Sequence, residues 1–164
     1  MTSSFSDALR VVNSLKAEGI VEDYAIAGAM AILFWTEPVP TYDLDVLVFL
    51  PGSTAQLVSL DGIYAWARRN GYPTDAEHVI VAGVPTQFLP APSKLADEAI
   101  RTAAEMDYEG IRVRVVRPEY LIALYLEPSA RTPKRQARAA MLLEWPGLSP
   151  AELDAILKRH GLTV

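Results

Sequence analysis

Two aspartates, Asp43 and Asp45, are the residues of this sequence whose type and spacing point most directly to chemistry. Asp43 directly precedes, and Asp45 lies within, the largely apolar run Leu44–Leu50, which predicts a strand. Residues two apart in a strand face the same side, so the two carboxylates project together. Like charges on a partly apolar face repel each other unless a cation or solvent compensates them. The pair predicts a binding site for Mg²⁺ or Mn²⁺. The alternative interpretation is that both carboxylates lie in solvent at the start of the strand and have no function.

An upstream glycine, Gly28, strengthens the hypothesis of a binding site. It separates a predicted strand over Tyr24–Ala27 from a predicted apolar helix over Ala29–Trp35. Free backbone N–H groups at the start of a helix favour triphosphate oxygens, through hydrogen bonds and the helix dipole. The alternative is that Gly28 only makes a tight turn or allows close packing.

The elements that must position these residues alternate between helix and strand. A first helix presents Leu9, Val12 and Leu15 on one face and stops at Gly19. Pro38 and Pro40 must follow the end of the helix after Gly28, and Pro51-Gly52 closes the aspartate strand. Further elements are predicted as a helix over Leu60–Asn70, a hairpin of His78–Ala82 and Pro85–Leu89 around Gly83-Val84, a helix from Ser93 to about Met106, and a strand near a sheet edge over Ile111–Val116.

The last third of the sequence predicts three helical pieces. Pro118, Pro133 and Pro150 each suit a first-turn position, and Ser149 with Glu152 forms a capping box. The pattern therefore predicts an α/β (α+β) core over residues 1–116, with a helical C-terminal extension over 117–164 packed on it as a single compact unit.

Composition narrows the classes of function. The 164 residues suit one domain with a true core, because 51% are hydrophobic and 21% charged. The absence of cysteine excludes disulfides and thiolate chemistry, and two histidines leave carboxylate oxygens as the main metal ligands. The net charge of −5 does not favour nucleic-acid binding by the whole surface, although a local basic patch stays compatible. No signal peptide or membrane span is predicted, so we expect a cytoplasmic protein without membrane contact.

With Gly28-Ala29, a helix and then Asp43-Leu44-Asp45, the sequence resembles the polymerase-beta-like nucleotidyltransferase superfamily, in particular small bacterial proteins of the AbiEii toxin type. Thr41 stands where many members have a threonine, and Arg117–Leu124 is similar to a "PE-x-L-I-A" helix of the family. The resemblance implies a nucleotidyltransferase-like mixed sheet flanked by helices. It implies metal ligation by Asp43 and Asp45, and nucleoside triphosphate binding by Gly28, Ala29, Thr41, Arg131 and Lys134.

The implied reaction is metal-dependent transfer of a nucleoside monophosphate to a hydroxyl of RNA or protein, in a toxin–antitoxin or phage-defence pair with an antitoxin partner. The sequence departs from the family at Gln87, which stands in place of a third catalytic carboxylate and cannot accept a proton at neutral pH. Tyr125-Leu126 replaces a frequent Lys-Leu, and Ala29 replaces glycine or serine. These departures keep open the alternative of a catalytically degenerate nucleotide-binding or protein-interaction module. A substitute acid such as Glu77 beside Gln87 would favour the enzyme.

Other residues with chemical potential have simpler interpretations. Arg131, Lys134, Arg135 and Arg138 could grip triphosphate or RNA, or form a solvated helix face opposite Ala137, Ala140 and Met141. Tyr42, Trp35 and Trp66 could stack on a base, but such aromatic residues are more often core. His78 and His160 have no partners at ligand spacing and receive no role.

Overall fold

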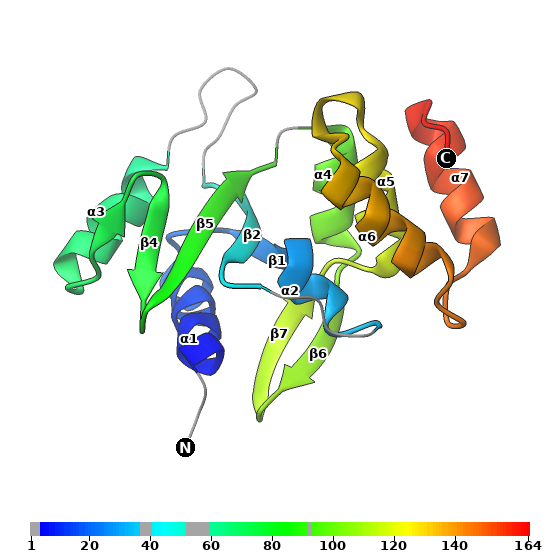
Figure 1. The fold of residues 1–164 in the computed structure, drawn as a ribbon. Helices are drawn as coiled ribbons and strands as arrows, with labels where there is room; N and C mark the ends of the chain where they lie inside the picture. Colours follow the sequence, from blue (N-terminus) through cyan, green and yellow to red (C-terminus); the bar gives the residue numbers. More distant parts are fainter. Residues whose placement is uncertain (1–3, 37–40, 52–59, 92) are drawn as a thin grey trace.

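A mixed sheet organises the chain (Figure 1). The computed structural model describes residues 4–36, 41–51, 60–91 and 93–164. Within these segments the strand order is β3-β4-β5-β2-β1-β7-β6. The strands are β1 (Asp23–Ala27), β2 (Leu44–Phe49), β3 (Thr74–Asp75), β4 (His78–Val81), β5 (Val84–Pro90), β6 (Ala104–Tyr108) and β7 (Ile111–Val115).

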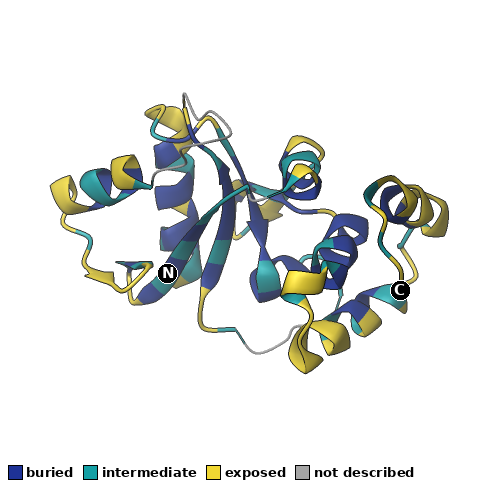
Figure 2. Cartoon of the chain, turned by 90° about the horizontal axis from the view of Figure 1, so that it is seen from above, coloured by how far each residue is buried: buried dark blue, intermediate teal, exposed yellow. Residues whose placement is uncertain are grey.

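The two faces of the central strands differ in burial. β2 pairs antiparallel with β1 and parallel with β5. One face carries Leu44, Val46 and Phe88, which are all buried. The opposite face carries Asp45 and Gln87, which are only partly buried. Figure 2 shows that the central strands are mainly buried, whereas the outer elements carry most of the exposed residues. The sheet therefore offers polar side chains on the face opposite its most apolar one.

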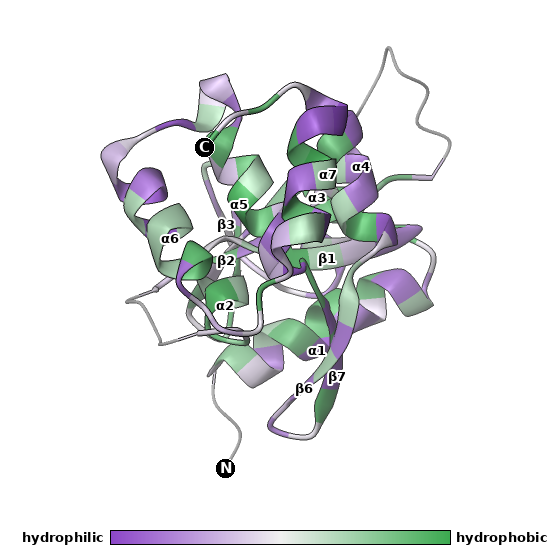
Figure 3. Cartoon of the chain, turned by 90° about the vertical axis from the view of Figure 1, so that its right-hand side faces the viewer, coloured by the Kyte–Doolittle hydropathy of each residue, from purple (hydrophilic) through white to green (hydrophobic). Residues whose placement is uncertain are grey.

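Helices surround the sheet at several points. α1 packs against β4, β5 and β7, and α4 packs against β1 and β2. α5 is almost wholly buried, and it packs against α4, α6 and α7. It is largely apolar, as its green shades in Figure 3 indicate. The helices are α1 (Ser4–Ala17), α2 (Gly28–Ile32), α3 (Asp61–Arg69), α4 (Lys94–Arg101), α5 (Pro118–Leu126), α6 (Pro133–Leu143) and α7 (Pro150–His160), with a 3-10 turn over Pro128–Ala130.

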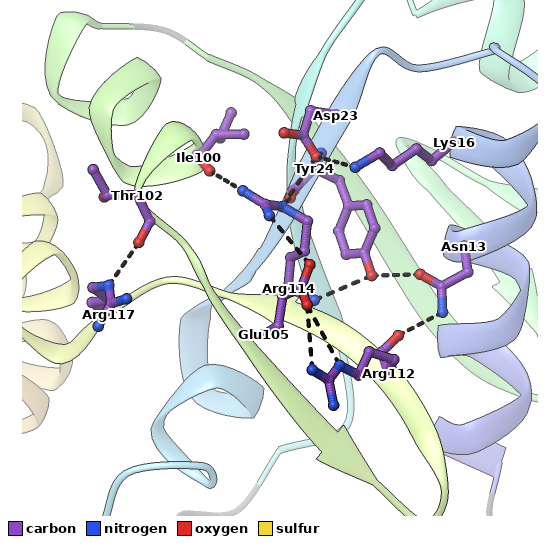
Figure 4. Close-up of polar contacts among 10 residues, drawn as sticks. All are labelled: Asn13, Lys16, Asp23, Tyr24, Ile100, Thr102, Glu105, Arg112, Arg114 and Arg117. Atoms are coloured by element: carbon purple, nitrogen blue, oxygen red, sulfur yellow. Dashed lines mark hydrogen bonds and ion pairs between the residues drawn. The ribbon is translucent and has the colours of Figure 1, made fainter.

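A polar network joins α1, β1, β7 and α4 (Figure 4). Tyr24 Oη donates to Asn13 Oδ1 at 2.5 Å and accepts from the Arg114 backbone N–H at 3.2 Å. The Arg114 guanidinium donates to the carbonyl oxygens of Tyr24 and Ile100 and lies 3.1 Å from Asp23 Oδ1. Burial raises the pKa of Tyr24 to about 12, so this hydroxyl stays protonated and keeps both hydrogen bonds.

Two predicted helices differ from the structure. The helix opened by Ser93 ends at Arg101 instead of continuing to Met106, because the chain turns at Thr102 and then forms β6. The prediction of helix to Met106 was therefore wrong. The helix after Gly28 is also shorter than predicted, since it ends at Ile32 and continues as turns to Thr36. The predicted stops at Pro38, Pro40 and Gly52 lie outside the described residues.

Other local predictions are confirmed. The hairpin of β4 and β5 exists, although its two-residue turn is Ala82-Gly83 and lies one position earlier than predicted. Pro118, Pro133 and Pro150 each occupy the first turn of a helix. Ser149 Oγ accepts from the Glu152 backbone N–H, which is one half of the predicted capping box.

The core is shared by the sheet and the C-terminal helices. One cluster of buried residues includes Val46 of β2, Leu121 of α5 and Leu157 of α7. None of the described helices combines the length and the apolar composition that crossing a bilayer requires.

Candidate functional site

A row of side chains crosses four neighbouring strands. Asp45 of β2 pairs with Ala27 of β1 on one side and with Gln87 of β5 on the other, and Gln87 pairs with His78 of β4. Directly paired residues point to the same face of a sheet. Asp45, Gln87 and His78 therefore share the partly exposed face. The strand register brings His78 and Gln87 beside Asp45, which lies more than 30 positions earlier in the sequence.

Gly28 and Asp45 approach each other closely. Gly28 has φ +63°, a conformation that disfavours other residues. A Cβ placed on Gly28 would lie 3.2 Å from both Cβ and Cγ of Asp45, and closer still to its carboxylate oxygen Oδ2. The carboxylate thus occupies the space that a larger residue at position 28 would need. Glycine is therefore favoured at this position both by the positive φ of the turn and by the close approach of Asp45.

A cleft of about 490 Å³ contains both aspartates. Its walls come from the start of α2, the segment that leads into β2, and α6, which Figure 1 shows beside one another. The predicted convergence of Asp43, Asp45 and the Gly28 turn is therefore found in the structure. The lining residues are Ala29, Thr41, Tyr42, Asp43, Asp45, Lys134, Ala137, Arg138 and Met141.

The two aspartates have different surroundings. Asp43 precedes β2 and has a side chain that is 54% exposed. Its backbone carbonyl accepts from Thr41 Oγ1 at 2.9 Å, which orders the approach to the strand. Asp45 is more buried, and burial followed by the charge of Asp43 raises its pKa, while His78, Arg135 and Arg138 act in the opposite direction. The cleft therefore holds a negative pair whose charge nearby cations only partly offset.

Two basic residues of α6, Lys134 and Arg138, lie on the cleft side. The simpler interpretation placed the basic residues on a face opposite Ala137 and Met141, but that arrangement is wrong for Lys134 and Arg138. These two line the cleft together with Ala137 and Met141. Helical spacing explains this, because positions i, i+3, i+4 and i+7 share one face. α6 packs on the rest of the protein chiefly through Ala139 and Leu142, its two buried residues.

Arg131 is not among the cleft-lining residues. Its guanidinium donates to the carbonyl oxygens of Leu126 and Thr163, both at 2.9 Å. It thereby ties the end of α5 to the C-terminal segment. The structure thus brings Gly28, Ala29, Thr41 and Lys134 to the aspartates and gives Arg131 other partners.

The position of the expected third carboxylate is taken by Gln87, directly beside Asp45 in the sheet. Glu77 is exposed, and its backbone carbonyl accepts from Tyr64 Oη at 2.9 Å. The described residues contain no group of three or more histidine, aspartate or glutamate side chains able to hold a metal ion. Asp43 and Asp45 are the carboxylates that the described cleft offers a cation.

Two further residues, His78 and Tyr42, lie at the site although they were not predicted as site residues. His78 Nε2 lies 4.0 Å from Asp43 Oδ2, and this contact depends on the exact register of the β4–β5 hairpin. Tyr42, interpreted as a probable core residue from sequence, is 83% exposed and lines the cleft. Its place beside Asp43, outside the strand, was the available signal for exposure. Trp66 is buried as expected, and Trp35 is partly buried against Trp145.

This architecture, a mixed sheet with paired carboxylates beside a glycine turn, is a nucleotidyltransferase-like fold. It is similar to an antigenic nucleotidyltransferase-like protein from Paracoccidioides brasiliensis, with a TM-score of 0.55 and 17% identity over 93% of this chain and 85% of the other. It is also similar to ANT(2'')-Ia in complex with adenylyl-2''-tobramycin, with a TM-score of 0.57 and 16% identity over 93% and 95% of the two chains.

The solution structure of the antibiotic-resistance factor ANT(2'')-Ia gives a TM-score of 0.56 and 16% identity over 98% of this chain and 93% of the other. No protein-family model matches the sequence, and no match is found among curated proteins. At these identities the likeness defines the fold, and the AbiEii-like subtype stays a prediction from sequence.

Proposed function

We propose that the protein transfers a nucleoside monophosphate from a nucleoside triphosphate to a hydroxyl group. The observation that carries the proposal is the packing of the Asp45 carboxylate against the Gly28 turn, in a cleft that also takes Asp43. Lys134 and Arg138 line the same cleft and supply positive charge for phosphate oxygens. The cleft thus combines acidic side chains, which suit a metal cation, with basic side chains, which suit the phosphate groups that carry this cation.

The two aspartates fit a divalent cation that shares its coordination shell with the substrate. Burial, and after it the charge of Asp43, raises the pKa of Asp45, so a cation would stabilise the ionised pair. Two carboxylates leave most of an octahedral Mg²⁺ or Mn²⁺ shell to phosphate and water oxygens. When bound, such an ion would neutralise charge on the phosphates. Asp43 and Asp45 would hold it, while Lys134 and Arg138 would orient the phosphate chain.

The proposed reaction forms one bond and breaks another. The acceptor oxygen bonds to the α-phosphorus, the bond from that phosphorus to the bridging oxygen breaks, and pyrophosphate leaves. The acceptor proton passes to water, because Gln87 has no basic oxygen at neutral pH. Most of the rate enhancement would therefore come from orientation and charge stabilisation in the cleft.

For the acceptor we propose a hydroxyl of RNA or of a protein. Adenylyl-2''-tobramycin, which occupies ANT(2'')-Ia, is an alcohol that carries an adenylyl group, so it illustrates this chemistry in a protein of similar fold. The basic face of α6 would repel a polycationic acceptor and attract an anionic one. A role in a toxin–antitoxin or phage-defence pair, with an antitoxin as partner, follows from the resemblance in sequence.

A second function, nucleotide binding or protein interaction without catalysis, is favoured by Gln87. Its amide stands beside Asp45 where a third carboxylate would complete the site. Such a protein would bind a triphosphate in the same cleft without cleaving it.

The two functions are distinguished by one experiment with matched controls. The protein is incubated with each α-³²P-labelled nucleoside triphosphate, Mg²⁺ or Mn²⁺, and cellular RNA and protein. Transfer predicts label in a macromolecule, and this label should fall about 10²-fold or more in Asp45→Asn. Asp154→Asn, an exposed change on α7, serves as the control. Triphosphate binding without transfer would support nucleotide binding without catalysis, and the absence of both binding and transfer would contradict the transferase function and the nucleotide-binding function.

A further inference from the structure

Tyr125 of α5 has a buried hydroxyl that the fold does not satisfy. The residue is 7% exposed, and its Oη has no hydrogen-bond acceptor among the described residues, although the Arg138 guanidinium lies close enough to donate to it. A buried hydroxyl proton without an acceptor is destabilising, and buried polar groups are paired in the great majority of cases. We therefore expect a bound ligand to supply the missing hydrogen-bond partner.

The surroundings of Tyr125 identify the kind of partner. Burial is the main effect on the Tyr125 hydroxyl and raises its pKa, while Arg138 lowers this pKa and Asp45 raises it. Arg138 and Asp45, which both line the cleft, therefore act on this hydroxyl. The hydroxyl stays protonated at neutral pH and is available as a donor. Arg138 cannot accept its proton, because a guanidinium has only donors. The group that is missing beside Tyr125 and Arg138 is a hydrogen-bond acceptor, preferably an anionic one.

We propose that Tyr125 is a phosphate-binding residue, which forms an anion site with the cleft-lining residue Arg138. A phosphate oxygen of the triphosphate accepts from the Tyr125 hydroxyl, while the Arg138 side chain turns onto the same anion. One phosphate group then satisfies the unpaired hydroxyl and the neighbouring guanidinium together. This inference rests on the proposed binding of a triphosphate and assigns Tyr125 a role in it.

A second tyrosine on the same helix provides a matched comparison. Tyr120 is 4% exposed, but its Oη is paired, since it donates to Glu98 Oε2 at 3.3 Å and lies 3.4 Å from Arg159 Nη2. Its hydroxyl has a structural role in joining α5, α4 and α7. Removing the two hydroxyl groups should therefore have opposite effects on the free protein.

The test measures the binding of inorganic tripolyphosphate by calorimetry and the stability of the free protein by urea unfolding. Tripolyphosphate is common to every nucleoside triphosphate, so the base preference does not matter. Tyr125→Phe should weaken tripolyphosphate binding about 5- to 10-fold and leave the free protein as stable as wild type or more stable. Tyr120→Phe should destabilise the free protein and leave binding unchanged.

Three outcomes would overturn the assignment. Equal affinity of wild type and Tyr125→Phe would mean that the hydroxyl does not contact phosphate, while the proposed function survives. Loss of stability in Tyr125→Phe with unchanged affinity would show a structural hydroxyl. Failure of the wild-type protein to bind either tripolyphosphate or any nucleoside triphosphate would overturn this assignment and the proposed function together. A double variant with Arg138→Gln should lose less than the sum of the two single effects if both residues hold one phosphate.

Discussion

The amide of Gln87 sets how much negative charge a cation meets in the cleft. Gln87→Asp places a third carboxylate beside Asp45 in the adjacent strand. We expect about 10-fold tighter Mn²⁺ binding in calorimetry, because carboxylate count governs the affinity of such sites. Any transferase rate should rise, by at most the 10²- to 10⁴-fold that a well-placed general base contributes.

The matched control for this change is the double variant Asp43→Asn, Gln87→Asp. Its Mn²⁺ affinity should return to about the wild-type value if the three side chains share one cation. Unchanged affinity in both variants would argue that Gln87 is an ordinary strand residue.

The close approach of Gly28 and Asp45 makes a second prediction for single residues. Gly28→Ala introduces a Cβ against the Asp45 side chain at a positive φ, so it should cost more than the ~1–2 kcal/mol of the backbone conformation alone. Gly83→Ala is the control, because Gly83 has φ +79° and nothing within 4 Å of the added Cβ. Urea unfolding measures both. Equal losses would show that the contact with Asp45 has no energetic importance.

Among the elements, the attachment of α1 to β1 and β7 depends on the Tyr24 hydroxyl. Tyr24→Phe leaves Asn13 Oδ1 and the Arg114 N–H without this partner in a largely buried site. We expect a loss of about 1–3 kcal/mol in the free energy of unfolding. Tyr64→Phe removes an exposed hydrogen bond to Glu77 and should change stability by less than about 0.5 kcal/mol. A similar small loss in both variants would contradict the structural role of the network.

The limits of prediction from sequence are also clearest among the elements. The β6 strand was missed because Ala103-Ala104-Glu105-Met106 favours a helix locally, whereas pairing with β7 decides its conformation. The signal that was available is Glu109-Gly110, a turn in which both residues have positive φ and which suits a two-residue hairpin.

In the candidate site too, local sequence pattern predicts some residues, whereas others are placed by long-range packing. Gly28, Asp43 and Asp45 lie close along the chain, so local pattern sufficed to predict that they converge. Lys134 enters the cleft and Arg131 does not, because the turn before α6 gives Arg131 other partners. His78 and Tyr125 reach the aspartates only through strand register and helix packing, which a single sequence does not reveal.

For the whole molecule, Glu98 links α4 to the C-terminal helix and should make stability depend on acid pH. Its carboxylate accepts from Arg159 Nη2 at 2.8 Å and lies 3.1 Å from His160 Nε2. The Arg159 hydrogen bond lowers the pKa of Glu98 from 4.5 to about 2, against the opposing effect of burial. A lowered folded-state pKa stabilises the protein above the unfolded value, so this contribution is complete above pH 4.5 and is lost as pH falls towards 2.

Glu98→Gln should therefore destabilise the protein at pH 7 by about 1 kcal/mol, discounted because 31% of the side chain is exposed and solvent screens the pair. The difference from wild type should shrink between pH 4.5 and 2 in urea unfolding. Asp154→Asn, in an exposed pair with Lys158, should cost no more than about 0.5 kcal/mol. A Glu98→Gln difference that stays constant down to pH 2 would contradict the ionic origin of the effect.

The two outermost strands of the described sheet bear on how the protein behaves at high concentration. β3 has two residues, and β6 exposes Glu105 and Asp107 along its length. An exposed strand edge is a template for pairing with another chain, and short or charged edges hinder such pairing. The described sheet therefore ends on both sides in strands that oppose edge-to-edge aggregation.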